Sequence, residues 1–354
     1  MRAFGLAVFV SAVLAIVGAF SRVSAWNDTG HMLAAEIAYR QVGLAERARA
    51  VQILKDAFQG PDSLERFEQD LTAGMPSGAS PGERDHYIFL KAATWPDILR
   101  DGPHSDHPHP LHGEFHKGGW HFIDLPFAPP GDGVAPPPPP VPTPPGMDPQ
   151  DAISAIRLCI ADVKAPGTSK RIRAARLCFL LHMVGDIHQP LHAAAMFSTD
   201  HLPGGDHGGN LQLVRLPGDA AEHDRVATLH SVWDGLFGYD TRLGTLRTLG
   251  DQILHGPTTR PDVLSSMLER KDPMQWAHES RDDAVQFAYL NGQLKTLRGM
   301  SLDGFRQQHQ LKARDVPSLP NNYRADALPI AEKRVALAGC RLAEILMEAL
   351  APAP

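Results

Sequence analysis

A histidine and an aspartate recur four residues apart in two apolar segments of this sequence. The first pair is His182 and Asp186 in LLHMVGDIHQPLH, and the second is His230 and Asp234 in LHSVWD. Residues four apart in an α-helix lie on one face, so both side chains of a pair can reach the same metal ion. Burial of an unpaired carboxylate is unfavourable, and a metal ion offsets that penalty. The two pairs together predict metal binding.

The first segment contains two more histidines. Pro190 would end the helix, and His192 follows where a chain reversal could return it to the same cavity. His188 lies only two residues after Asp186, so it would point elsewhere if the helix holds. Imidazole and carboxylate ligands suit zinc, which makes zinc the expected metal.

Three further pieces extend the pattern: Trp26 with His31 in WNDTGH, Asp97 in ATWPDILR and His121 in WHFID. The ordered set Trp, His, Asp, His, HxxxDxxQPLH, GGN and HxxxD resembles the zinc-dependent single-strand nucleases of fungi and plants, the S1/P1 type. These nucleases share a fold with bacterial zinc-dependent phospholipase C. The resemblance spans about residues 26 to 350, and it includes the C-terminal stretch AGCRLAEIL.

The resemblance implies three zinc ions per chain. The first buried zinc would be held by Asp97, His121, His182 and Asp186. The second would be held by Asp186 again, by His31, and by the free amine and the carbonyl oxygen of Trp26. The third, more exposed zinc would be held by His192, His230 and Asp234. A carboxylate shared by two sites is the arrangement that keeps two cations close together.

The resemblance also implies an endonuclease that cleaves single-stranded DNA and RNA to products with 5′-phosphates, and it leaves removal of 3′-phosphates open. Asp97 would orient the attacking water, and Arg100 would contact the phosphate, unless it is an ordinary surface arginine. Phe122 would stack on a base, unless it packs in the core. Asp124 and Asn210 would bind the edge of that base.

Two other functions fit the metal ligands. A phospholipase C acting on lipid head groups would use the same three zinc ions, but no amphipathic, Trp-rich segment suited to a lipid surface is evident. A zinc-binding protein without catalysis would not need Asp97 and Arg100. The formal net charge is -6, so nucleic acid would have to bind at a local site rather than through a general basic field.

The first 25 residues have the pattern of a signal peptide. Arg2 precedes an apolar run from Ala3 to Phe20, and small residues precede an expected cleavage between Ala25 and Trp26. The alternative is an uncleaved membrane anchor. Cleavage predicts a secreted or periplasmic protein without a membrane anchor, which we expect to be a monomer. Cleavage would also free the amine of Trp26 to bind zinc.

Apolar residues recur every three to four positions along most of the chain, which predicts an all-α fold. We interpret residues 26–354 as a single domain of the phospholipase C/nuclease type with a three-zinc cleft. The predicted helices are Thr29 to Val42, Leu44 to Phe58, Leu64 to Ala73, Asp151 to Lys164, Ser169 to Ile187, Ala221 to Leu236, Thr258 to Leu268, Pro273 to Leu290 and Pro329 to Ala349.

Two irregular segments interrupt this pattern. Proline occupies 12 of the 24 residues from 126 to 149, which excludes a helix and predicts a surface loop inserted into the domain. Residues 101 to 119 hold five histidines among prolines and glycines, which indicates a solvated loop or an accessory zinc site. Of the three cysteines, Cys178 lies in an apolar run, so we expect any disulfide to join Cys159 and Cys340.

Overall fold

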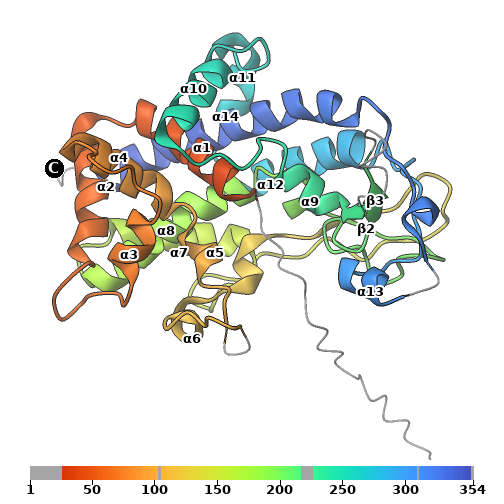
Figure 1. Ribbon diagram of the computed structural model, residues 1–354, viewed down its shortest axis with the longest axis horizontal. Coiled ribbons are helices and arrows are strands. Elements are labelled where there is room, and N and C mark those ends of the chain that lie inside the picture. Colours follow the sequence, from red (N-terminus) through yellow and green to blue (C-terminus); the bar gives the residue numbers. More distant parts are fainter. Residues whose placement is uncertain (1–25, 103–104, 217–225, 309–310, 352–354) are drawn as a thin grey trace, which may run out of the picture.

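The computed structural model describes residues 26–102, 105–216, 226–308 and 311–351 (Figure 1). The predicted signal peptide lies outside the described residues. The described part is mainly helical, which confirms the all-α prediction. Its α-helices are α1 (Asp28–Gln41), α2 (Leu44–Asp56), α3 (Phe67–Thr72), α4 (Pro81–Ala92), α5 (Trp95–Ile98), α6 (His112–Phe115), α7 (Ala152–Lys164), α8 (Lys170–Asp186), α9 (Leu229–Asp234), α10 (Leu243–Leu254), α11 (Pro261–Leu268), α12 (Pro273–Asp283), α13 (Leu302–Gln307) and α14 (Tyr323–Ala349).

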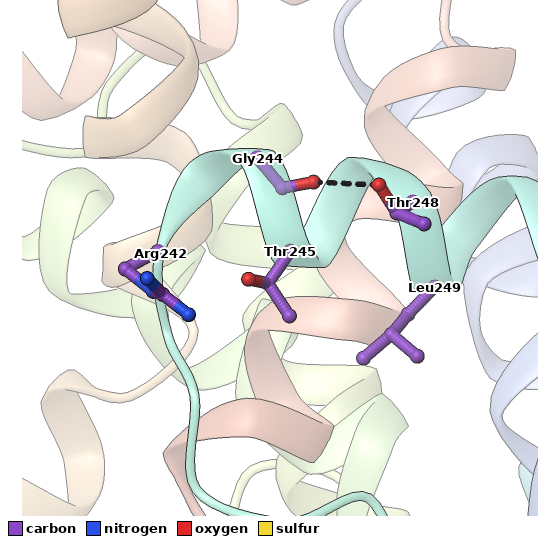
Figure 2. A pocket seen from close by; sticks show the side chains of 5 residues that line it. All are labelled: Arg242, Gly244, Thr245, Thr248 and Leu249. Carbon is purple, nitrogen blue, oxygen red and sulfur yellow. Dashed lines mark hydrogen bonds between the residues drawn. The ribbon is translucent and has the colours of Figure 1, made fainter.

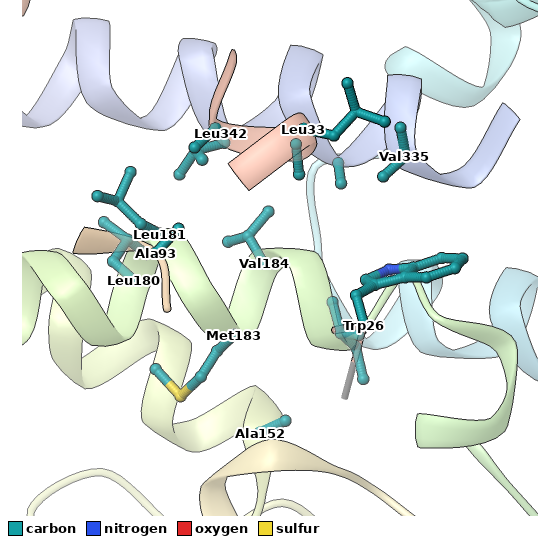
Figure 3. Close-up of a cluster of buried hydrophobic side chains, with 14 of the residues drawn as sticks. Trp26, Leu33, Ala93, Ala152, Leu180, Leu181, Met183, Val184, Val335 and Leu342 are labelled. Carbon is teal, nitrogen blue, oxygen red and sulfur yellow. The ribbon is translucent and has the colours of Figure 1, made fainter. Parts of the chain in front are cut away.

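Helix α8 lies at the centre of the core. Its residues 177–186 are all buried, and they include the predicted ligands His182 and Asp186. Helices α1, α2, α7 and α14 pack against it, and α1 packs along α14. Leu33, Val184 and Val335 meet where α1, α8 and α14 come together (Figure 3). A Cβ atom at Gly339 would lie 2.4 Å from Ile37 Cγ2, so the close approach of α1 and α14 requires glycine there.

Side-chain caps fix the first residue of three helices that carry predicted metal ligands, α1, α8 and α9. Asn27 accepts a hydrogen bond from Gly30 N at the start of α1. Ser169 caps α8 by accepting from Ile172 N, and Thr228 caps α9 by accepting from Ser231 N. Each cap satisfies a backbone N–H that the helix itself leaves without a partner.

Four short strands lie beside the predicted site. Strand β1 (Leu125–Phe127) pairs in parallel with β2 (Ala194–Met196), and β3 (Leu213–Arg215) pairs antiparallel with β4 (Val226–Thr228). Strand β1 begins just after WHFID, and β2 begins two residues after His192. The 3-10 turns η1 (Gly118–His121) and η2 (Pro190–His192) precede these two strands. The small sheet therefore holds two ligand-bearing segments side by side.

The structure differs from the predicted helices at several places. The helix predicted from Ala221 to Leu236 is wrong: residues 226–228 form β4, because they pair with β3, and only α9 is helical. Residues 221–225 lie outside the described residues. The predicted helix from Pro273 to Leu290 is α12 followed by a π-helical turn, η3 (Ala284–Ala288), and Leu290 adopts a positive φ. The remaining 3-10 turn is η4 (Ala313–Asp315).

The proline-rich segment has no helix or strand from residue 128 to residue 149, all of which are described. Its end is anchored where Trp120 Nε1 donates to Pro149 O at 2.8 Å. No described helix is long and apolar enough to cross a membrane.

The predicted disulfide is wrong, because all three cysteines are free. Cys159 is buried on α7, which packs on α8, and burial raises the pKa of its thiol to about 12. Cys340 lies on α14, and its Sγ accepts a hydrogen bond from Gln41 Nε2 on α1. The two thiols therefore have different packing partners.

Candidate metal centre

The structure brings the predicted histidine and aspartate ligands together in three groups. The ligand atoms within each group lie within 4.8 Å of one another. The groups are His31 with Asp97 and His182; His121 with His182 and Asp186; and His192 with His230 and Asp234. These residues come from α1, α5, η1, α8, η2 and α9, so the fold collects them from segments far apart in the sequence.

Hydrogen-bond acceptors face one another around His182. Its Nδ1 donates to Ala93 O at 2.7 Å, so Nε2 is the nitrogen that has a lone pair for a metal ion when the ring is neutral. That Nε2 lies 3.1 Å from Asp186 Oδ2 and 3.6 Å from Asp97 Oδ1. His121 Nδ1 lies 3.0 Å from the same Asp186 oxygen. Acceptors held this close need a proton or a metal cation between them.

The other oxygen of Asp186 faces a different histidine. His31 Nε2 lies 3.3 Å from Asp186 Oδ1 and 4.0 Å from Asp97 Oδ2, and its ring stacks on that of His182. Neither ring nitrogen of His31 has a hydrogen-bond partner among the described residues. Gly185 leaves room for this ring, because a Cβ there would lie 3.1 Å from His31 Nδ1. Asp186 therefore lies between two groups of nitrogen ligands, as a bridging carboxylate would.

Trp26 lies against the same end of α8. Its indole Nε1 donates to Gly185 O at 3.2 Å, and the side chain is fully buried. A Cβ at Gly30 would lie 2.7 Å from Trp26 Cβ, so Trp26 also packs closely on the first turn of α1. Trp26 thus lies next to the backbone that carries His31 and Asp186.

The third group repeats the arrangement of facing acceptors. His192 Nδ1 donates to His121 O at 2.6 Å, and His230 Nδ1 donates to Gly208 O at 2.7 Å. The two Nε2 atoms then face each other at 3.1 Å, with Asp234 Oδ2 3.6 Å from His230 Nε2. Gly208 has φ 62°, and a Cβ there would lie 2.3 Å from Leu191 O, so its carbonyl position depends on glycine.

Burial sets the charge state of these groups when no metal is bound. It lowers the pKa of His31, His121 and His192 well below the usual value, so these three imidazoles are neutral, as ligands must be, whereas at His182 burial is outweighed by the Asp186 and Asp97 carboxylates, which raise the pKa. It raises the pKa of Asp186 to about 6 and the pKa of Asp234 well above its usual value. The donor set therefore fits divalent zinc, which would stabilise both carboxylates in their charged form.

Arg100 contacts two of the predicted ligands, Asp97 and His121. Its Nη2 lies 2.8 Å from Asp97 Oδ1 and 3.2 Å from His121 Nδ1, and one fifth of its side chain is exposed. Asp97 is about one tenth exposed. Both side chains therefore lie at the boundary between the buried ligands and solvent.

The structure places the predicted base-binding residues on two segments. Phe122 is 41% exposed, and its backbone carbonyl accepts from Ala152 N. Burial, followed by the nearby Asp206 carboxylate, raises the pKa of Asp124 to about 7. The side chain of Asn210 donates to His207 O at 2.8 Å within its own loop. The contact predicted between these residues and a base stays a prediction.

Two residues that support the predicted ligand segments, Gln189 and Arg341, were not predicted from the sequence. Gln189 is fully buried, and its Nε2 donates to Asp234 Oδ1 at 2.8 Å. His188 points away from the cluster, as predicted: Nδ1 donates to Val184 O, and Nε2 accepts from Arg341 Nη1 at 2.8 Å. Arg341 lies in AGCRLAEIL and is buried, so this stretch of α14 contacts the segment that follows α8.

Part of the histidine-rich loop is bonded to the fold rather than solvated. His109 is buried, and its Nε2 contacts Asp70 Oδ2 at 2.9 Å. The same oxygen accepts from Trp95 Nε1 at 3.3 Å, and His112 Nδ1 donates to Leu99 O at 2.7 Å. These bonds tie the loop to α5, the helix that carries Asp97. Residues 103–104, including His104, lie outside the described part.

The family model of the S1/P1 nucleases matches residues 26–351. The chain belongs to the S1/P1 nuclease family. Two Arabidopsis thaliana proteins are similar to part of it: Endonuclease 5 is 29% identical over 181 residues, and Endonuclease 4 is 31% identical over 180 residues. These matches cover 48% of the chain, and the chain spans about half the length of both relatives.

Proposed function

We propose that this protein is a secreted, zinc-dependent endonuclease that hydrolyses phosphodiester bonds of single-stranded DNA and RNA and leaves 5′-phosphates. The main support is the set of buried acceptor atoms that face one another at about 3 Å in separate groups beside an exposed aromatic ring. Membership in the S1/P1 nuclease family and the names of the Arabidopsis relatives support the same activity.

Three zinc ions per chain are part of the proposal. Asp97, His121, His182 and Asp186 would hold the first, and His192, His230 and Asp234 the third. The second would be held by His31, Asp186, and the amine and carbonyl of Trp26. Bound zinc would supply positive charge to the phosphate oxygens and lower the pKa of a water molecule.

Two side chains between the buried ligands and solvent, Asp97 and Arg100, would orient the attacking water and bind the phosphate. Asp97 would accept a hydrogen bond from the attacking water and so orient it toward phosphorus. Arg100 would donate to a non-bridging phosphate oxygen, which would offset the negative charge that grows in the transition state. Its existing contact with Asp97 keeps the guanidinium beside that position.

Base recognition would use the exposed ring of Phe122. Stacking on a ring accepts any base, which favours single strands with little sequence preference. Asp124 and Asn210 would hydrogen-bond the edge of the stacked base. Removal of 3′-phosphates is a second reaction that the same site could support.

Export follows from the zinc proposal. The amine of Trp26 becomes a ligand only if residues 1–25 are removed, so we place the mature protein outside the cytoplasm. Removal of residues 1–25 would also leave it without a membrane anchor. We further propose that it is a monomer.

Metal counting combined with a substrate panel tests the proposal. The mature protein should contain three zinc ions by mass spectrometry and should cleave single-stranded DNA and RNA, but not phosphatidylcholine. A chelator should abolish cleavage, and added zinc should restore it. Asp97→Asn should reduce kcat by at least about 100-fold, whereas Asp262→Asn, an exposed carboxylate on α11, should not. Turnover of lipid alone, or of no substrate, would refute the nuclease.

A further inference from the structure

One buried carboxylate outside the proposed ligand set joins three separate segments. Asp206 is fully buried, and its Oδ1 accepts from Met196 N, at the end of β2, at 2.9 Å. Its Oδ2 accepts from the hydroxyl of Tyr289 at 2.7 Å. Tyr289 is also fully buried and directly follows the π-helical turn η3. Burial of a carboxylate is unfavourable unless donors satisfy it, so these bonds hold β2, η3 and the loop around Asp206 together.

The loop that carries Asp206 has a backbone that needs support from outside the loop. Four of its residues have positive φ: Gly205, His207, Gly208 and Gly209. The value at His207 is 52°, which is unfavourable for a residue with a Cβ atom. Leu211 N donates to Asp206 O at 3.0 Å and closes the loop. Because the local sequence does not favour this shape, the loop depends on the contacts of the Asp206 side chain.

The same loop contacts both parts of the proposed site. Gly208 O accepts from His230 Nδ1 at 2.7 Å, so its position decides which nitrogen of His230 faces the third metal group. His207 O accepts from Asn210 Nδ2 at 2.8 Å, which fixes one of the predicted base-binding side chains. A shift of the loop would therefore move a metal ligand and a base-binding residue at once.

Open space does not mark this position. A cleft of about 520 Å³ lies instead at the start of α10 (Figure 2). It is lined by residues that are not predicted ligands: Arg242, Gly244, Thr245, Thr248 and Leu249. Thr248 Oγ1 donates within its own helix, to Gly244 O at 3.0 Å. The buried contacts of Asp206, rather than this cleft, point to the residues that support the centre.

We propose that Asp206 and Tyr289 are positioning residues that link metal binding to base binding. This inference rests on the proposed nuclease function. The two side chains hold the loop in place, so that His230 and Asn210 keep their positions together. Gly208 O then keeps the proton of His230 on Nδ1, which leaves Nε2 to bind zinc. Without the carboxylate, zinc binding at the third group and base binding should weaken together.

Zinc affinity and NMR test the metal part of this proposal. Asp206→Ala should weaken one of three zinc ions by about 10- to 100-fold in chelator competition, the usual loss when a group that orients a metal ligand is removed. In the zinc-free protein, ¹⁵N NMR should show His230 as the Nδ1–H tautomer in wild type and as a mixture of tautomers in Asp206→Ala. Tyr289→Phe should weaken the same zinc by about 2- to 10-fold, because it removes one hydrogen bond. Asp206→Asn, which keeps an acceptor for Met196 N, should restore part of the affinity.

Tyr87→Phe controls for the loss of a buried hydroxyl. Tyr87 is buried, and its hydroxyl donates to Ala73 O at 2.8 Å, so the variant loses a comparable bond. It should lower the melting temperature but leave zinc affinity and the His230 tautomer unchanged.

Kinetics at saturating zinc test the base part. Asp206→Ala should raise KM for a single-stranded 12-mer by about 2- to 10-fold. KM for bis(4-nitrophenyl) phosphate, a phosphodiester without a base, should stay near the wild-type value. An equal change for both substrates would remove Asn210 from the proposed role.

Two results would overturn the positioning role. One is wild-type zinc affinity with an unchanged His230 tautomer in both Asp206→Ala and Tyr289→Phe. The other is loss of all three zinc ions together, which would indicate collapse of the whole centre. Zinc affinity and the tautomer are measured without substrate, so failure of the wild-type protein to cleave DNA or RNA would count against the nuclease alone.

Discussion

Gln189, which is not one of the proposed metal ligands, supports the third group of predicted ligands. Gln189 Nε2 donates to Asp234 Oδ1 at 2.8 Å, while its Oε1 accepts from Leu191 N at 2.5 Å. Burial already raises the pKa of Asp234, and the Gln189 bond acts in the opposite direction. Gln189→Met keeps the length of the side chain but removes both bonds. Protons should then compete more effectively with zinc for Asp234.

The expected loss can be estimated. A hydrogen bond to a charged acceptor contributes about 1.5–3 kcal/mol, which corresponds to roughly 10- to 150-fold in affinity. Loss of a partner that orients a metal ligand typically lowers metal affinity by about 10- to 100-fold. We therefore expect one of three zinc ions to bind about 10- to 100-fold more weakly, and the other two to stay.

Competition with a chromogenic chelator, followed by metal counting, measures this loss. Thr259→Val is the matched control: Thr259 is also buried and hydrogen-bonded, near the end of α10, but contacts no proposed ligand. It should lower the melting temperature without changing zinc affinity. If Gln189→Met retained the third zinc at wild-type affinity, or lost all three zinc ions together, the reasoning would be refuted.

Three other predictions address the rest of the centre. Asp186→Asn should lose two zinc ions by mass spectrometry, because both oxygens of Asp186 face ligand nitrogens; a count of three would contradict the bridging role. One extra residue before Trp26 should remove one zinc ion, and a protein that keeps all three would show that the amine is not a ligand. With zinc chelated, Asp124→Asn should raise the melting temperature relative to wild type more at pH 7.5 than at pH 5, because burial raises the pKa of Asp124 to about 7, so the stability that its protonated form contributes is present at pH 5 and is lost as the pH rises through about 7. The same difference between variant and wild type at both pH values would argue against this role of Asp124.

Spacing in the sequence was sufficient to predict which histidine and aspartate lie close together in two pairs. His182 with Asp186, and His230 with Asp234, lie one helical turn apart, and helix geometry alone brings each pair to one face. This prediction survived even though the second helix is only six residues long. Local spacing within one turn does not depend on where the helix begins.

Features that depend on tertiary packing were not predictable in this way. The residues before α9 form a strand because β3, which ends at Arg215, lies beside them and pairs with them. The expected Cys159–Cys340 pair was wrong because composition does not report which helix faces which. Gln189 was not recognised because an amide that supports a ligand has no spacing rule of its own.

The carbonyl oxygens that orient the imidazoles have a consequence for protein engineering. His182, His192 and His230 are held by the backbone of Ala93, His121 and Gly208, none of which lies in the HxxxDxxQPLH segment. A short peptide with that segment would carry the donor atoms but not their orientation. Transplanting the proposed centre into another scaffold would therefore require six separate backbone segments in register, those of His31, Asp97, His121, His182 to His192, Gly208 and His230. A search for new members by motif alone should return chains that cannot build it.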